Sequence, residues 1–115
     1  MAKKIYKVYV IELSKKVFSE NAKFRNKNPQ YNGVLECLYV GMTSKSPHKR
    51  FLQHKEALLS KKGKKLSSSI VKKYGLYLRP SLYEHLPAMS RQEALKMEVD
   101  LADTLKRKRY AVWHN

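Results

Sequence analysis

The sequence predicts an α/β fold of the α+β kind, with a small three-stranded, mostly antiparallel sheet flanked by helices. The order of the predicted elements supports this class, because two strands and two helices precede a third strand and a final helix. The length of 115 residues suits one domain with a modest core, and 43% of the residues are hydrophobic. We therefore expect residues 1–115 to form a single globular domain.

Two short apolar runs predict the first two strands. Residues 4–12 are rich in β-branched and aromatic side chains and too short for a typical helix. Residues 34–40 have the same character, and Gly41 closes this second run. Between the two strands, residues 14–33 form a basic connection or insertion, with a helical turn expected near Val17 to Phe24. Cys37, which lies within the second run, is expected to be a small buried hydrophobe.

The middle of the chain predicts two helices and a third strand. Ser46 can accept a hydrogen bond from a free backbone amide, and Pro47 suits the first helical position, so a helix is expected to about Ser60. A short helix from Leu66 to Tyr74 follows, with Gly75 as its stop, and residues 82–86 alternate as a strand. The apolar stripe of the first of these helices is predicted to be Phe51, Leu52, Leu58 and Leu59, interrupted by Lys55.

The final helix has the strongest start signal. Ser90 and Glu93 form a capping box, in which each side chain accepts from the backbone amide of the other residue. The helix is expected to end near Arg107, and its predicted buried stripe is Ala94, Leu95, Leu101, Ala102 and Leu105.

Glu98 falls in the middle of this buried stripe, whereas the other acidic residues of the helix point away from it. Burying a carboxylate without compensation costs several kcal/mol, by rough estimate. Glu98 is therefore expected to have a cationic partner such as Arg50 or a lysine, to bind a metal ion, or to line a solvent-filled cleft.

The charge of the chain points to a polyanionic partner. Lys and Arg number 25 against nine acidic residues, which gives a formal net charge of +16. Nucleic acid is the expected partner. An anionic membrane would respond to the same charge, but the sequence has no long apolar run and no signal-peptide pattern, so a soluble cytoplasmic protein is expected.

Arg50 and His54 are four residues apart and share one face of the predicted helix. A guanidinium group suits phosphate, and an imidazole can transfer a proton near neutral pH. By themselves such residues are usually solvated surface groups. The four histidines and the single cysteine are scattered and do not show the spacing of a zinc site.

Read together, several short motifs resemble the GIY-YIG nuclease family. They are Val8-Tyr9 in the first strand, Tyr39-Val40-Gly41 ending the second, then Thr43, Arg50, His54, Lys73-Tyr74-Gly75, Ala94-Leu95-Lys96-Met97-Glu98 and Asn115. The resemblance covers nearly the whole chain. Lys7 stands where the first family motif usually has glycine, and residues 14–33 lengthen a connection that is short in the family.

The resemblance implies a divalent-metal-dependent endonuclease that hydrolyses DNA phosphodiester bonds. Glu98 would hold Mg²⁺ (or Mn²⁺), and no small-molecule cofactor is expected. Arg50 would neutralise charge on the phosphate, and Tyr9 would be the general base, with a pKa lowered by basic surroundings and the metal. Tyr39 and His54 would orient water or shuttle protons, although which tyrosine takes the proton stays open.

The resemblance also implies nucleic-acid contacts at Gly41 and Thr43. The surplus positive charge predicts further contacts with the phosphate backbone at Lys61, Lys62, Lys64 and Lys65, and at Lys106, Arg107, Lys108 and Arg109.

Three alternatives remain open at this stage. Outside the motif context, both tyrosines would be strand aromatics packed against a helix. The chain could be a non-catalytic basic nucleic-acid-binding module, for which Tyr9, Arg50 and Glu98 would be dispensable. It could also be an interaction domain for acidic proteins. Strandedness, site preference and oligomeric state are left open by the sequence.

Overall fold

The computed structural model describes residues 3–56 and 69–114, with only the backbone of His54, Glu56 and Ser69, and its centre is a four-stranded mixed sheet in the order β3-β1-β2-β4. β1 (Lys7–Leu13) pairs antiparallel with β2 (Cys37–Thr43) and with β3 (Gly75–Leu78). β4 (Ala111–His114) pairs parallel with β2. The α+β class is confirmed. The predicted three-stranded, mostly antiparallel sheet is corrected by this fourth, parallel strand.

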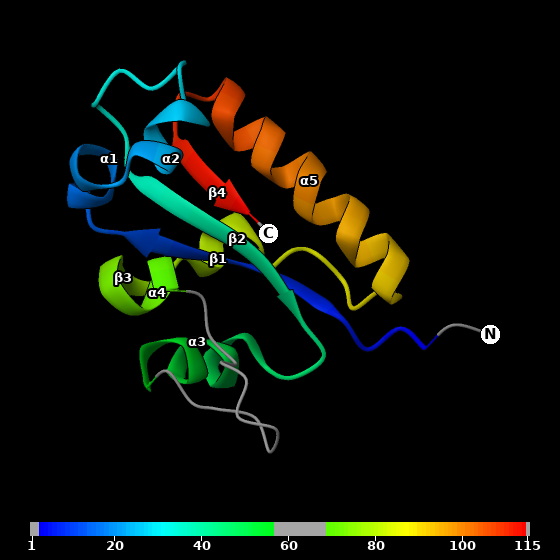
Figure 1. Cartoon of the computed structure of the whole chain (residues 1–115). Coiled ribbons are helices and arrows are strands. Elements are labelled where there is room, and N and C mark those ends of the chain that lie inside the picture. Colours follow the sequence, from blue (N-terminus) through cyan, green and yellow to red (C-terminus); the bar gives the residue numbers. More distant parts are fainter. Residues whose placement is uncertain (1–2, 57–68, 115) are drawn as a thin grey trace.

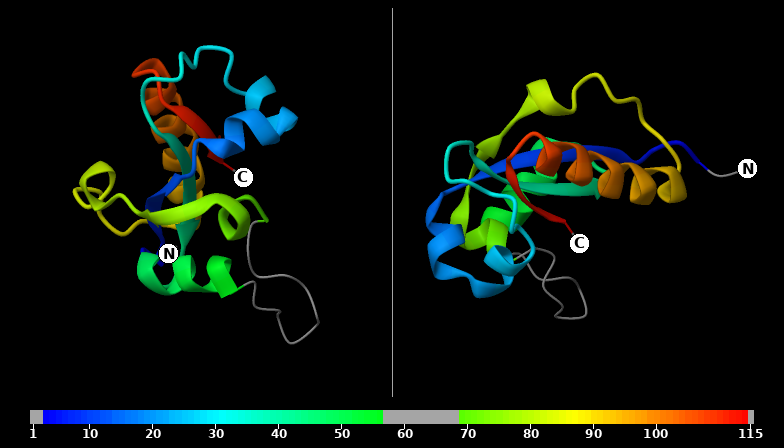
Figure 2. Two further views of the ribbon diagram at one scale, coloured as in Figure 1. Left: turned by 90° about the vertical axis from the view of Figure 1, so that its left-hand side faces the viewer. Right: turned by 90° about the horizontal axis from the view of Figure 1, so that it is seen from above.

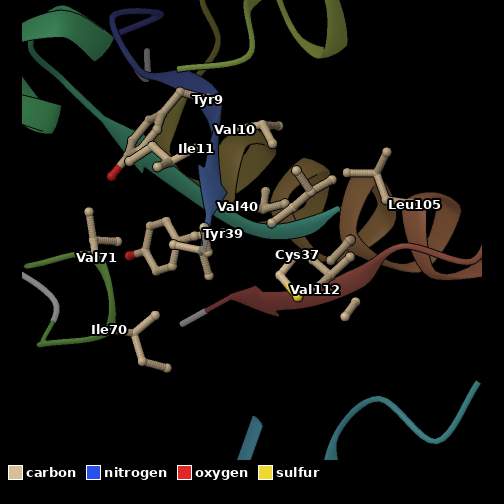
Figure 3. Close-up of a cluster of buried hydrophobic side chains, with 14 of the residues drawn as sticks. Tyr9, Val10, Ile11, Cys37, Tyr39, Val40, Ile70, Val71, Leu105 and Val112 are labelled. Carbon is tan, nitrogen blue, oxygen red and sulfur yellow. The ribbon is translucent and has the colours of Figure 1, made fainter. Parts of the chain in front are cut away.

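Helices cover both faces of the sheet. α5 (Arg91–Arg107) packs against β4, β2 and β1 on one side, and α3 (Pro47–Glu56) lies on the other side (Figure 1, Figure 2). Because side chains alternate along a strand, Val10 and Val40 point toward α5, whereas Tyr9 and Tyr39 point away from it (Figure 3). The core therefore has two halves, one on each face of β1 and β2.

The predicted boundaries of β2 and of the helix after it need correction. β2 does not close at Gly41 but continues to Thr43. Leu52 of α3, expected in a buried stripe, is exposed, whereas Phe51 is half-buried as expected. Leu58 and Leu59 lie outside the described residues.

The strand predicted at residues 82–86 is wrong. The third strand is Gly75–Leu78, directly after α4 (Ser69–Tyr74), and residues 80–86 form the short 3-10 helix η1 (Pro80–Leu82) followed by a turn. Tyr83 is buried and Leu86 is half-buried, so the alternating pattern arose from a turn that faces the core. β3 begins at Gly75, where a β-carbon would lie 2.5 Å from the Val71 carbonyl oxygen, so the close approach of α4 requires glycine at this junction.

α5 confirms the capping-box prediction. The Ser90 hydroxyl accepts from the Glu93 amide at 3.1 Å, and the Glu93 carboxylate accepts from the Ser90 amide at 2.9 Å. Three positions of the predicted stripe are buried, namely Ala94, Ala102 and Leu105. Leu101 is half-buried. The predicted burial of Leu95 is wrong, since 44% of this residue is exposed. Among the described residues, no helix is long and apolar enough to cross a bilayer.

The basic insertion forms two short helices, α1 (Lys16–Glu20) and α2 (Ala22–Asn26), as the expected helical turn suggested. Asn28 fastens it to β4: its Oδ1 accepts from the Val112 amide at 2.6 Å, and its Nδ2 donates to the Phe24 carbonyl at 2.8 Å. Phe24 is buried and stacks on Trp113 with the ring planes 12° apart. The insertion is therefore part of the core rather than a loose loop.

Candidate functional site

The two central strands bring Tyr9 and Tyr39 together on the face opposite α5. In the β1–β2 register Tyr9 lies opposite Gly41, and Ile11 lies opposite Tyr39. The two rings are tilted by 42°, with their centroids 6.3 Å apart, and each residue is only 1% exposed. Both hydroxyl oxygens lie on the same side of the sheet (Figure 3). The motif residues of the two strands therefore form one cluster.

Gly41 leaves room for this cluster. A β-carbon at this position would lie 2.6 Å from the Tyr9 hydroxyl oxygen and 2.9 Å from Cε1 of Tyr39. Such approaches are shorter than real β-carbon contacts, so a larger residue would displace one of the tyrosines. The role of Gly41 in the protein is thus steric, because it lets the Tyr9 ring lie over β2.

Arg50 comes to the cluster from α3. The start of this helix is fixed as predicted, because the Ser46 hydroxyl accepts from the Lys49 amide at 3.1 Å. The Arg50 side chain hydrogen-bonds the Tyr9 side chain and also donates to Oε1 of Gln53 at 3.2 Å. Arg50 is therefore held against the Tyr9 hydroxyl by the helix that the sequence assigned to it.

Arg50 also lines an open pocket of about 240 Å³ at the end of β2. Its lining includes Thr43, whose Oγ1 accepts from the Lys45 amide at 3.0 Å, together with Tyr6 and Gln53. The pocket lining combines two cationic side chains, Lys45 and Arg50, with hydroxyl and amide groups. Such a lining suits a phosphate-containing ligand.

Glu98 approaches from the α5 side of the sheet. Its side chain is buried, with the residue 3% exposed, as its place on the helical wheel predicted. Its Oε1 lies 3.9 Å from Nδ1 of His114, which follows Val112 and Trp113 on β4. His114 was not among the cationic partners that the sequence suggested. The sequence offered no signal for this neighbour, because β4 itself was not predicted.

Both Arg50 and Glu98 affect the pKa of Tyr9. Burial raises the pKa of its phenol well above the ordinary value of 10.0, and the neighbouring Tyr39 adds to the rise. The charge and the hydrogen bond of Arg50 lower the pKa, while the Glu98 carboxylate raises it. The lowered phenol pKa that the resemblance implied is therefore wrong for this structure, because burial raises the pKa by more than Arg50 lowers it.

The remaining predicted site residues are placed only in part. His54 lies one helical turn after Arg50 on α3, and its side chain is outside the described structure, as are Asn115, Lys61, Lys62, Lys64 and Lys65. Tyr74, from the Lys73-Tyr74-Gly75 stretch, donates through its hydroxyl to Glu20 of α1 at 2.9 Å. That stretch therefore connects α4 to the insertion.

Sequence reasoning did not select Tyr6, Lys45, Gln53 or His114, all of which lie beside the predicted residues. Lys45 and Gln53 stand close in sequence to Thr43 and Arg50, and that proximity was the available signal. Within residues 3–56 and 69–114, no group of three or more His, Cys, Asp or Glu side chains gathers as metal ligands. A cation at Glu98 would need oxygen ligands from water or from a bound phosphate as well.

No protein-family model matches the chain, and neither a curated protein nor a solved structure matches it. Its function therefore has to be inferred from the chemistry of these residues.

Proposed function

We propose that this protein is a divalent-metal-dependent endonuclease that hydrolyses DNA phosphodiester bonds in the manner of the GIY-YIG family. One observation carries the proposal: the Arg50 side chain of α3 hydrogen-bonds the Tyr9 phenol of β1, and the buried Glu98 carboxylate of α5 raises the pKa of the same phenol. Three segments distant in sequence thus contribute a phenol, a guanidinium that hydrogen-bonds it, and a buried carboxylate that influences its pKa. The net charge of +16 supports a nucleic-acid substrate.

Arg50 is the group that meets the phosphate. Its side chain hydrogen-bonds Tyr9 and also lines a pocket that opens to solvent. A fixed cation at this position stabilises negative charge that develops on the phosphate oxygens during hydrolysis. Lys45 and Thr43 at the same pocket hold the neighbouring backbone.

Tyr9 is the general base of the proposed reaction. A water molecule attacks phosphorus, its proton passes to the Tyr9 oxygen, and the bond to the leaving oxygen breaks. Tyr9 must first lose its own proton to solvent, and the charge and hydrogen bond of Arg50 favour the resulting phenolate. Neutralising the Glu98 charge with a bound cation would remove one of the effects that raise the Tyr9 pKa. Tyr39 and His54 orient the water or return a proton to the leaving group.

Glu98 is the proposed metal ligand. Its carboxylate is a hard oxygen donor, is buried, and acts electrostatically on the Tyr9 phenol, so it fits Mg²⁺ or Mn²⁺ with the remaining positions open to water and phosphate oxygens. The ion, when bound, supplies positive charge to the phosphate. Asn115 stays part of the proposal by family resemblance. We place this activity in the cytoplasm.

The deciding experiment is cleavage of labelled single-stranded and double-stranded DNA at low salt, with Mg²⁺, Mn²⁺ or EDTA. We expect metal-dependent cutting that falls roughly 10²-fold or more in Glu98→Ala, as when an electrostatic group of an active site is removed. Asp100→Ala is the matched control, because Asp100 is an exposed acid two residues further along α5. Equal cutting by the two variants would refute the role of Glu98.

A non-catalytic basic nucleic-acid-binding module is the second candidate. The observation in its favour is the burial of Tyr9, which raises the phenol pKa and makes a packed aromatic residue a natural alternative to a base. This candidate predicts tight binding without cutting on any substrate. It also predicts that Arg50→Ala and Tyr9→Phe leave function unchanged.

A further inference from the structure

The last turn of α5 and the neighbouring α2 together form a dense basic surface. The two segments touch, because Nζ of Lys106 donates to the Lys27 carbonyl at 3.0 Å, and Figure 1 shows α2 beside the end of α5. The members of this α2–α5 basic surface are Lys23, Lys27, Lys106, Arg107, Lys108 and Arg109. All are exposed except Lys106, which is half-buried.

Arg109 is held in an unfavourable backbone conformation. Its φ is 80°, and it is the one non-glycine residue with positive φ in the part of the chain that the structure describes. The Arg109 amide donates to the Lys106 carbonyl at 2.9 Å, and the Tyr110 amide donates to the Leu105 carbonyl at 3.1 Å. These bonds define a Schellman motif, in which the position of Arg109 is usually glycine. A side chain there is strained, since its β-carbon crowds the following carbonyl.

The folding of α5 does not explain this arginine. Cations near a helix C-terminus do interact favourably with the helix dipole, but Lys106 and Arg107 already supply that charge in the last turn. Arg109 adds a further like charge beside them, and it does so where glycine would relieve strain. Strain kept at a surface position is evidence for a ligand that needs the side chain.

The charges of this surface are also left available for a ligand. Within the described ranges, none of its six members forms an ion pair with an aspartate or glutamate. Lys27 lies over the Trp113 ring at 4.4 Å, and Arg107 donates to Oγ1 of Thr104 at 3.2 Å. These are neutral partners, so the positive charge of the surface is not compensated internally.

We propose that the α2–α5 basic surface is a nucleic-acid contact additional to the proposed active site, and that it binds backbone phosphates away from the cut bond. The inference rests on the proposed function in taking nucleic acid as the partner. A membrane fits less well, because α2 and the last turn of α5 carry none of the large exposed hydrophobic residues that insertion needs. Phosphate contacts, in contrast, need only such cations.

The geometry also sets where on the DNA this contact falls. Arg109 follows Glu98 by 11 residues, which corresponds to roughly 16 Å along a helix. Phosphates along one strand of duplex DNA are spaced by about 3.4 Å of helix axis. On a duplex lying parallel to α5, the basic surface would contact phosphates about five base pairs from the cut bond, and shorter substrates would lose this contact.

The test is binding of a labelled 20-base-pair duplex in EDTA over a series of salt concentrations. Arg109→Gly is the informative variant, because glycine removes the charge and the strain together. We expect affinity to fall several-fold and the slope of log K against log salt to become shallower by about 0.9. The melting temperature of the variant should rise by a few degrees. Lys23→Ala/Lys108→Ala should make the slope shallower by about twice as much.

Arg91→Ala is the matched control, because Arg91 is an exposed arginine at the opposite end of α5. The proposal is overturned if Arg109→Gly changes the slope no more than Arg91→Ala, or if its melting temperature does not rise. Loss of binding to vesicles of phosphatidylserine and phosphatidylcholine, with DNA binding kept, would overturn it in favour of a membrane. A chain that cuts no DNA yet shows the expected slope refutes the proposed nuclease and leaves this inference standing.

Discussion

The hydroxyl oxygen of Tyr9 lies 2.6 Å from the point where a β-carbon on residue 41 would stand. The glycine of one strand and the tyrosine of the next are thus a matched pair across the β1–β2 register. This pair joins fold and proposed chemistry, because the same space that permits tight strand packing holds the phenol oxygen in place.

Gly41→Ala tests this pairing directly. The added methyl group must displace the Tyr9 or the Tyr39 ring, and overpacking of this kind costs about 1–3 kcal/mol of unfolding free energy. Tyr9→Phe removes the nearest clashing atom. We therefore expect Tyr9→Phe/Gly41→Ala to lose less stability in urea denaturation than the sum of the two single variants. Strictly additive losses would show that the two residues do not share this space.

The pH dependence of stability reports the raised Tyr9 pKa. The folded state holds the phenol proton more strongly than the unfolded state, whose value is near 10. This contribution is fully present below pH 10 and is lost as pH rises toward the folded value. Between pH 9 and 11 the wild type should therefore lose stability more steeply than Tyr9→Phe, as measured by urea denaturation. Parallel profiles would mean that burial does not control this phenol.

Asn28 is predicted to hold the free edge of β4. In Asn28→Leu the Val112 amide and the Phe24 carbonyl lose their partner inside the protein, and each such loss costs about 1–3 kcal/mol. Hydrogen exchange at the Val112 amide should become faster, while amides of β1 keep their protection. Asn26→Leu is the control, because Asn26 is exposed at the end of α2. Equal destabilisation by both variants would contradict this role.

Lys55 ties α3 to α4 and β3. Its Nζ donates to the Lys72 carbonyl at 3.3 Å and to the Gly75 carbonyl at 2.8 Å. Lys55→Met keeps the apolar stem and removes the donor, so we expect a loss of about 1 kcal/mol and faster amide exchange in α3. Lys49→Met, at an exposed position of the same helix, should change neither quantity. Because α3 carries Arg50, DNA cleavage provides a further readout.

Local signals predicted most of the elements. The Ser90–Glu93 capping box predicted the start of α5, and the β-branched run around Val8 to Ile11 predicted β1, because short-range chemistry decides both. β4 was missed, since it has only four residues, follows a basic run, and forms by pairing with a strand about 70 residues earlier. The strand predicted at residues 82–86 failed because apolar alternation also arises where a turn faces the core.

For the candidate site too, local features could be predicted from the sequence, whereas contacts between distant segments could not. The burial of Glu98 could be predicted from the angular position of one residue on a helical wheel. Its neighbour His114 could not be predicted, because that contact depends on β4. The exposure of Leu95 shows the limit of the wheel, since which side of an apolar stripe is covered depends on the neighbouring elements.

The hydrogen bond between Asn28 and the Val112 amide has a consequence for folding during translation. Asn28 and Val112 are 84 residues apart, and β4 follows every other described element in the chain. On the ribosome their hydrogen bond cannot form until residue 112 has left the exit tunnel, and long-range contacts of this kind generally form slowly. During translation residues 14–33 therefore cannot reach their final position until β4 has been made. The α2–α5 basic surface, to which Lys23 and Lys27 belong, is complete only after that step.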